Sequence, residues 1–234
     1  MIETRTDTIA LTDGTQLRLT VAEPENVVRG GLVVLHEDEG VTERIRIILA
    51  ALAEEGWLTV APHLYHGNGA AEPDSDAEEP WVAERVRGLS GDSLLADTDA
   101  AFVWLADRGV SGDRQGIMGF DIGGTAALVV AASRRLGAAV TVGGGGIVTP
   151  LSAGLPPLVE VAEEVSCPWL GMYGEMDSHI PPEEIDKLRS AASGAGAITD
   201  VVRYSRADHR FDTAPDSAEE AWRRARNWFD LHLR

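Results

Sequence analysis

The stretch Gly116-Ile117-Met118-Gly119-Phe120-Asp121-Ile122-Gly123-Gly124 joins a short apolar run, a glycine-flanked turn and the start of an alanine-rich segment. This succession predicts a buried strand, a sharp turn and a helix, which is the layout that presents a nucleophile at a strand-to-helix turn. Asp121 stands at the apex of this turn, where a serine or a cysteine is usual. The identity of this one residue therefore decides which reactions the chain can perform.

The segments around this turn alternate between short β-branched runs and longer runs with helical spacing. The alternation predicts an α/β fold, with a mostly parallel doubly wound sheet, an N-terminal antiparallel hairpin and no large cap domain. The expected strands are residues 8–11, 16–22, 30–36, 57–62, 115–119, 138–142, 169–173 and 200–204, and the expected helices are 42–55, 93–107, 124–136, 182–192 and 217–233.

Two regions, 63–91 and 143–165, follow neither period. The first is rich in Pro, Asp, Glu and Gly, and is interpreted either as a flap over the site or as a surface loop, since loops of this length tend to be functional. The Gly143–Gly146 run is expected to be a turn with unusual backbone angles. Neither region is long enough for a second folded unit, so residues 1–234 are predicted to form one domain.

The balance of charge restricts the partners that this chain can have. The sequence holds 20 Lys and Arg against 38 Asp and Glu, a formal net charge of −18. Such a surface repels phosphate backbones and anionic lipids, so neither nucleic acid nor a membrane is an expected partner. A small-molecule substrate is expected instead, with the chain acting as a monomer or a homodimer.

The lone Cys167 excludes an internal disulfide and favours a reducing compartment. It opens an apolar strand, where a thiol is usually a small buried hydrophobe. The first residues lack the features of a signal peptide, and no stretch approaches the length needed to span a bilayer. A cytoplasmic location is therefore expected.

Chemistry in open α/β sheets gathers beyond the carboxyl ends of the strands. Three of the residues found there, Asp121, Asp177 and His209, follow the chain order nucleophile, acid, histidine of α/β-hydrolases. Each alone has a structural interpretation, because an Asp after a strand is often a helix cap. Their order along the chain favours a catalytic group.

At these positions the chain resembles the dienelactone hydrolase family over residues 30–233. The segment Gly119-Phe120-Asp121-Ile122-Gly123-Gly124 looks like that family's Gly-Phe-Cys-x-Gly-Gly turn. The acid and histidine segments of the family are similar to 174–181 and 207–211, and its early strand ends are similar to 35–37 and 61–65. The resemblance implies an α/β-hydrolase fold.

Carried over position by position, the resemblance implies a role for each matching residue. Asp177 would orient His209, which would carry the proton, and Glu37 would match a glutamate near the nucleophile. The backbone N–H groups of Ile122 and of Glu37 or Asp38 would form the oxyanion hole. The residues expected to bind substrate are His36, His63, Tyr65, Trp81, Arg85 and Arg210.

The chain departs from the family at two positions. The nucleophile is an aspartate, and Thr213 stands where the family has an arginine that helps to hold a substrate carboxylate. Arg85, Arg87, Arg206 or Arg210 could replace that arginine. Dienelactone itself is therefore a poor expectation for the substrate.

An aspartate is already ionised at neutral pH, so its activation is not the difficulty. Attack on an ester carbonyl would give a mixed anhydride, from which the carboxylate is expelled in preference to an alkoxide. Carboxylates do attack saturated carbon, as in haloalkane dehalogenases and epoxide hydrolases, and leave an alkyl ester that water can hydrolyse. Crowding of Glu37, Asp121 and Asp177 could instead raise one pKa and allow direct attack by water with Asp121 or His209 as base.

The sequence thus favours a dienelactone hydrolase-like hydrolase of a small organic substrate. The group that carries its chemistry is expected to be Asp121, His209, Asp177 and Glu37. A catalytically inactive relative that keeps the pocket as a small-molecule binding site is the alternative. A metal held by His36, Glu37 and His63 has suitable ligand types but no recognised spacing, so neither a metal nor any other cofactor is predicted.

Overall fold

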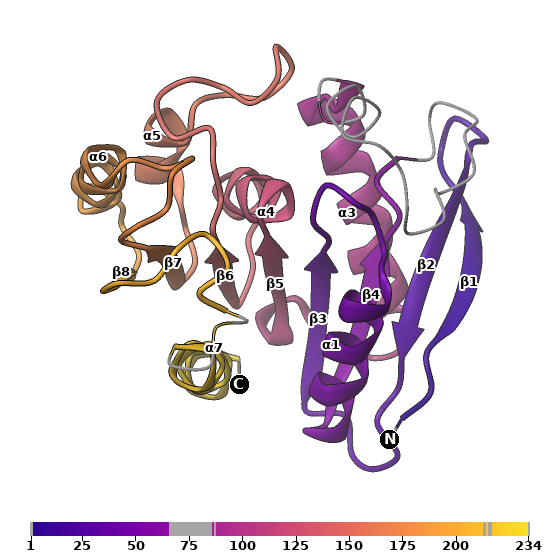
Figure 1. Ribbon diagram of the computed structural model, residues 1–234. Coiled ribbons are helices and arrows are strands. Elements are labelled where there is room, and N and C mark those ends of the chain that lie inside the picture. The colour runs from indigo at the N-terminus through magenta and orange to yellow at the C-terminus, as the bar shows by residue number, and fades with distance from the viewer. Residues whose placement is uncertain (1, 66–85, 87, 213, 215–216, 234) are drawn as a thin grey trace.

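A computed structural model describes residues 2–65, 86, 88–212, 214 and 217–233 (Figure 1). Its strands form one eight-stranded sheet in the order β1-β2-β4-β3-β5-β6-β7-β8. The first two strands are antiparallel to their neighbours and the other six run parallel. The strands are β1 (Arg5–Ala10), β2 (Gln16–Ala22), β3 (Gly30–Leu35), β4 (Trp57–Pro62), β5 (Gln115–Phe120), β6 (Ala138–Val142), β7 (Trp169–Gly174) and β8 (Thr199–Tyr204).

Helices cover both faces of this sheet (Figure 1). On one face lie α1 (Glu43–Glu54) and α7 (Ala218–His232), and on the other lie α3 (Gly91–Ala106), α4 (Ile122–Ser133), α5 (Leu158–Val161) and α6 (Pro182–Ala192). Each face has its own apolar core. The central strands β3, β4, β5, β6 and β7 are buried along their whole length, which explains their continuous apolar sequences.

The helices follow from local sequence. In α1 the buried residues Ile45, Ile48, Leu49 and Leu52 recur at helical spacing, and Gly56, with φ of 97°, follows the helix end. Helix α4 is buried almost all round because it lies against β3, β5, β6 and α3. Small side chains in α4 allow this close approach.

The predicted α/β architecture is correct, and several element boundaries differ. Strand β1 begins at Arg5 rather than at residue 8, because it pairs with β2 over the whole hairpin. Helix α4 begins at Ile122, directly after the turn, and ends at Ser133, beyond which Arg134 is extended. A short helix, α5, lies inside the region 143–165 that was expected to be irregular. The Gly143–Gly146 turn has the expected positive φ at its two end residues, 64° and 71°.

The fold brings the ends of the parallel strands to one edge of the sheet. Residues 36–38, 121, 175–177 and 205–209 follow β3, β5, β7 and β8, all of which end at this edge. Most of the region 63–91, the flap or surface loop of the sequence analysis, lies outside the described residues. No helix within the described ranges is both long and apolar enough to cross a lipid bilayer.

Candidate active site

Asp121 lies at a tight turn between β5 and α4, with φ of 51° and ψ of −118°. Non-glycine residues rarely adopt a positive φ, so this backbone is strained. Two glycines make the turn possible. A Cβ atom on Gly119 would collide with the carbonyl oxygen of Gly123, and one on Gly123 would collide with the carbonyl oxygen of His36. The start of α4 is therefore pressed against the end of β3.

His209 reaches Asp121 from the loop after β8. Its Nδ1 atom forms a hydrogen bond of 2.6 Å with Oδ2 of Asp177, and its Nε2 atom lies 3.5 Å from Oδ1 of Asp121. The loops that carry Asp177 and His209 are in direct contact, since a Cβ atom on Gly174 would collide with the carbonyl oxygen of Asp208. The imidazole ring thus lies between two carboxylates.

The exposure of the three side chains differs. Only 1% of the Asp177 side chain is exposed, against 24% for His209 and 34% for Asp121. Asp177 can therefore orient the ring but cannot meet a substrate. Asp121 has the exposure that a group attacking a substrate needs.

Electrostatics make His209 a cation at rest. Its interactions with Asp121 and then with Asp177 raise its pKa to about 10, although burial opposes them. Burial alone would raise the pKa of Asp177, but hydrogen bonds from His209 and from the backbone N–H groups of His179 and Ile180 outweigh it and lower that pKa. At neutral pH the ring is therefore an imidazolium, and its two N–H groups face the carboxylates of Asp177 and Asp121.

Glu37 is a further carboxyl group near Asp121. Burial raises its pKa, and the Arg44 and Arg210 guanidinium groups oppose this effect, while Asp212 and Asp121 add to it. Nη1 of Arg44 donates to Oε1 of Glu37 at 2.5 Å, and Nη2 of Arg210 lies 3.4 Å from the same oxygen. A pair of arginines therefore faces the glutamate that follows β3.

The two backbone N–H groups predicted to form an oxyanion hole belong to Ile122 and Asp38, and this role stays a prediction. Ile122 is the first residue of α4, where an N–H group has no acceptor within its own helix. Asp38 follows the end of β3, against which the start of α4 packs. The Asp38 carboxyl is half-buried, and burial, followed by the nearby Asp121 and Glu39, raises its pKa.

Two histidines expected to bind substrate lie inside the fold. His36 is fully buried, accepts a hydrogen bond from the Leu64 N–H group at Nε2, and donates from Nδ1 to the carbonyl oxygen of Glu37. His63 is buried as well, with Nε2 2.8 Å from the Thr20 hydroxyl. These contacts join the end of β3 to the end of β4 and the end of β4 to β2. Substrate binding by either ring stays a prediction.

The other residues expected to bind substrate differ in exposure, and two of them are not described. Tyr65 is buried, with its ring tilted against that of His36 at a centroid distance of 5.1 Å. The Arg210 side chain is half exposed beside Glu37. Trp81 and Arg85 lie outside the described residues.

Three residues near the site were not expected from the sequence. Arg44, in the first turn of α1, joins Glu37 to Asp212, which lies three residues after His209. The exposed His179 packs edge-on against His209, with a centroid distance of 5.6 Å. Its position two residues after the predicted acid was the only signal for His179. For Arg44 the signal was its place in the helix that follows β3.

Asp177, His179 and His209 bring possible metal-ligand atoms within 4.8 Å of one another. The Asp177 oxygens, however, already accept from His209 and from two backbone N–H groups. A metal at this place would have to break the bond that orients His209, so the donor set fits proton transfer better. Cys167 is buried in the core, and burial raises its pKa to about 12, so its thiol stays protonated.

Together the sheet order, the strained turn and the Asp121–His209–Asp177 arrangement define an α/β-hydrolase. Residues 17–233 match the model of the dienelactone hydrolase family. The chain therefore belongs to the dienelactone hydrolase family, and it is a hydrolase of the α/β-hydrolase type.

Individual relatives agree with this assignment. A Yersinia pestis protein named "Putative carboxymethylenebutenolidase" is 33% identical over 208 residues, which cover 86% of this chain and 78% of that protein. The Rhodococcus opacus "Carboxymethylenebutenolidase" is 30% identical, over 86% of this chain and 81% of its own length. The crystal structure titled "Putative Dienelactone Hydrolase" from Klebsiella pneumoniae superimposes with a TM-score of 0.87 at 30% identity, covering 97% of this chain and 98% of that one.

Proposed function

We propose that this protein hydrolyses a small organic molecule through a covalent ester on Asp121, with His209 as proton carrier and Asp177 as the residue that orients it. The observation that supports the proposal is the strained position of Asp121 and its 3.5 Å separation from a histidine held by a buried acid. This is the arrangement of a nucleophile and its base. This site differs from the usual one in that its nucleophile is a carboxylate rather than a hydroxyl or a thiol.

A carboxylate nucleophile selects the electrophile. We propose attack at a saturated carbon that bears a good leaving group, as in an epoxide or a haloalkane. One Asp121 oxygen forms a bond to the carbon, and the carbon–oxygen or carbon–halogen bond breaks with its electron pair on the leaving atom. Water then attacks the ester carbonyl, which releases the alcohol and returns Asp121 as a carboxylate.

The charge of His209 fits the order of these steps. An imidazolium with a pKa of about 10 is a poor base at neutral pH, which argues against direct attack by a water molecule that His209 activates. Esterification removes the charge of Asp121, the first of the two groups that raise this pKa. His209 then gives its proton to the alkoxide of an opened epoxide, or to solvent when a halide has left. The neutral ring is the base that takes a proton from the attacking water, and the second proton of that water goes to the released alcohol.

The backbone supports the second step. When water attacks the ester carbonyl, negative charge develops on the carbonyl oxygen. The N–H groups of Ile122 and Asp38 are the proposed donors to that oxygen.

The test is a panel of aryl esters, lactones, epoxides and haloalkanes offered to the wild type, Asp121→Asn, Asp121→Cys and His209→Ala. The proposal expects turnover of epoxides or haloalkanes that Asp121→Asn abolishes. In His209→Ala the alkyl ester should accumulate, and mass spectrometry of the peptide that contains Asp121 should show the added mass.

Other results would contradict the proposal. Ester turnover that persists in Asp121→Asn and is lost in His209→Ala would favour attack by water. An inert wild type that binds panel compounds in calorimetry would favour the binding-protein alternative. Esterase activity gained in Asp121→Cys would then show that the scaffold is intact and that its native chemistry is lost.

A further inference from the structure

The Arg44 side chain contacts three segments that meet at the active site. Its guanidinium donates to Glu37, which follows β3, and to Asp212 in the loop that carries His209. Its Cζ atom lies 4.9 Å from the ring centroid of Phe120, the residue immediately before Asp121. One cation from α1 thus joins all three chain segments around the proposed nucleophile.

We propose that Arg44 is a positioning residue of the active site: it joins the His209 loop to the end of β3 and holds the Glu37 side chain in place beside Asp121. The roles of Asp121 and His209 in this inference rest on the proposed function. The contacts of Arg44 do not depend on it.

The two carboxylates that Arg44 contacts are buried, so they depend on this cation. Only 9% of the Glu37 side chain and 6% of the Asp212 side chain are exposed, and both carboxylates face the same guanidinium. Buried carboxylates without a partner would take up protons or draw in water. Arg44 prevents both at once because a guanidinium can donate in two directions from one planar group.

The charged groups that face Glu37 come from three places. Arg44 comes from α1, Arg210 and Asp212 come from the loop after β8, and Asp121 comes from the turn after β5. Arg44 opposes the effect of burial on the pKa of Glu37 more than any other of these groups does. Arg210 is half exposed and lies farther from Glu37, so it cannot fully replace Arg44.

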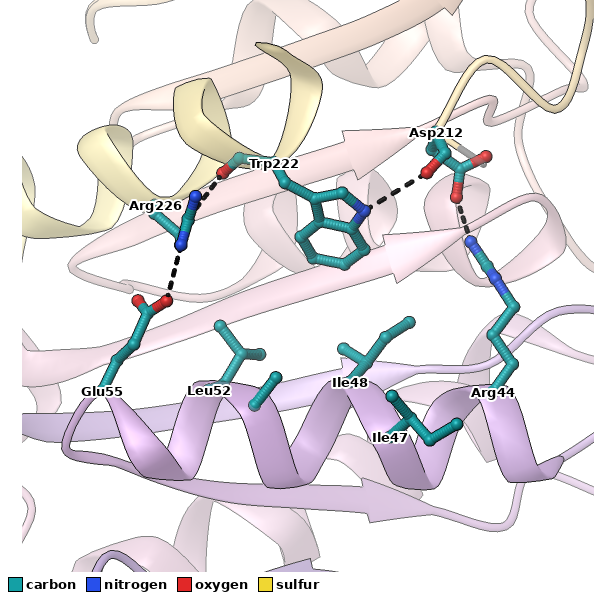
Figure 2. A pocket seen from close by; sticks show the side chains of 9 residues that line it. Arg44, Ile47, Ile48, Leu52, Glu55, Asp212, Trp222 and Arg226 are labelled. Carbon is teal, nitrogen blue, oxygen red and sulfur yellow. Dashed lines mark hydrogen bonds and ion pairs between the residues drawn. The ribbon is translucent and has the colours of Figure 1, made fainter. Parts of the chain in front are cut away.

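A second ion pair that lines the same groove offers a matched control. Arg44 and Asp212 stand at one end of a groove of about 520 Å³ between α1 and α7, and Arg226 and Glu55 stand at the other (Figure 2). Nη1 of Arg226 donates to Oε1 of Glu55 at 3.0 Å. This second ion pair joins α7 to Glu55, the residue that follows α1. Among the described residues, the side-chain contacts of Arg226 are with Glu55 and the Trp222 carbonyl oxygen, and neither belongs to the site.

The experiment compares Arg44→Met, Arg44→Lys and Arg226→Met with the wild type. Glutamate labelled with ¹³C at the side-chain carboxyl reports the titration of Glu37 by NMR, and Glu37→Gln assigns its signal. Loss of an opposite charge at this distance usually moves a carboxyl pKa by about one to three units. The Glu37 midpoint is expected to rise by that amount in Arg44→Met, to rise less in Arg44→Lys, and to stay unchanged in Arg226→Met.

Turnover supplies the second measurement. Activity should fall in Arg44→Met, with a partial return in Arg44→Lys and no change in Arg226→Met, because the His209 loop loses its link to the end of β3. A residue that only supports folding would lower activity without moving the Glu37 midpoint. If Arg44→Met does not fold, the same measurements are compared between Arg44→Lys and Arg226→Met.

Two results would overturn the inference. One is a Glu37 midpoint that is the same in the wild type and in the Arg44 variants. The other is an equal shift in Arg226→Met. The NMR titration needs no substrate, so a wild type that is inert on every panel compound would defeat the proposed function and leave this measurement decisive for Arg44.

Discussion

His209 and Asp121 form an ion pair, with Nε2 of the ring 3.5 Å from Oδ1 of the carboxylate. In most enzymes with this turn, the histidine faces a neutral hydroxyl or a thiol that it must deprotonate. Here it faces an anion, so the ring at rest holds a proton rather than waiting to take one.

The titration of His209 should depend on Asp121. In the wild type the ring should titrate with a pKa of about 10. Asp121→Asn removes the first of the two groups that raise this pKa, so the midpoint should fall while remaining above 6.5, because Asp177 still accepts from Nδ1. NMR of the ring protons measures both values. An unchanged midpoint in Asp121→Asn would show that the two side chains are not in contact.

Stability should depend on pH through the same ring. Because its folded pKa is raised from 6.5 to about 10, the contribution of His209 to stability is complete below pH 6.5 and is lost as pH rises to 10. The free energy of unfolding should therefore fall across this window by more in the wild type than in His209→Gln. Urea denaturation at several pH values measures the difference. Parallel curves for the two proteins would contradict the raised pKa.

The sequence predicts which residues lie at the ends of the strands, but it does not predict the contacts that their side chains make. Asp121, Asp177 and His209 could be named because each follows a strand, and parallel strands bring their ends to one edge. The burial of His36 and His63 could not be predicted, since a residue at a strand end can turn either way. Their hydrogen bonds to Leu64 and Thr20 exist only once β2, β3 and β4 are assembled.

Arg44 illustrates the same limit. Its position in a helix with an apolar face predicts an exposed cation, and nothing local indicates that Asp212, 168 residues later, will lie beside it. The substitutes expected for the family's arginine were Arg206 and Arg210 near His209, and Arg85 and Arg87 in the region 63–91. Arg44, which lies far from all four in the sequence, was not among them. The order of elements predicts a fold better than it predicts contacts between distant side chains.

Gly143 should matter for the position of His209. Its φ is 64°, and a Cβ atom there would lie 3.2 Å from Cε1 of His209. Gly143→Ala should therefore cost about 1–2 kcal/mol for its backbone and should also displace the ring. Gly14→Ala is the control, since Gly14 has φ of 86° and nothing within 4 Å of such a Cβ.

Both glycine variants should lose similar stability in thermal denaturation, and only Gly143→Ala should lose activity and change the His209 NMR signals. Equal activity in the two variants would show that the ring tolerates the added methyl group.

The two arginines of the α1–α7 groove should differ in their contribution to stability. Arg44→Met leaves two buried carboxylates without their shared cation, and removal of one partner from a buried ion pair usually costs about 3–5 kcal/mol. Arg226→Met breaks a more exposed pair and should cost about 0–1 kcal/mol. Urea denaturation at neutral pH compares the two. Equal losses would mean that the Arg44 contacts are no stronger than surface contacts.

The measurement that tests the covalent role of Asp121 most directly is a single turnover in H₂¹⁸O, with enzyme in excess over a turned-over epoxide or haloalkane. Water that attacks the ester carbonyl leaves its oxygen on Asp121, so the alcohol should contain an unlabelled oxygen from the enzyme. Mass spectrometry of the peptide that carries Asp121 should show one ¹⁸O atom. Labelled oxygen in the first product, with an unlabelled peptide, would contradict the account, because water would then have attacked the substrate itself.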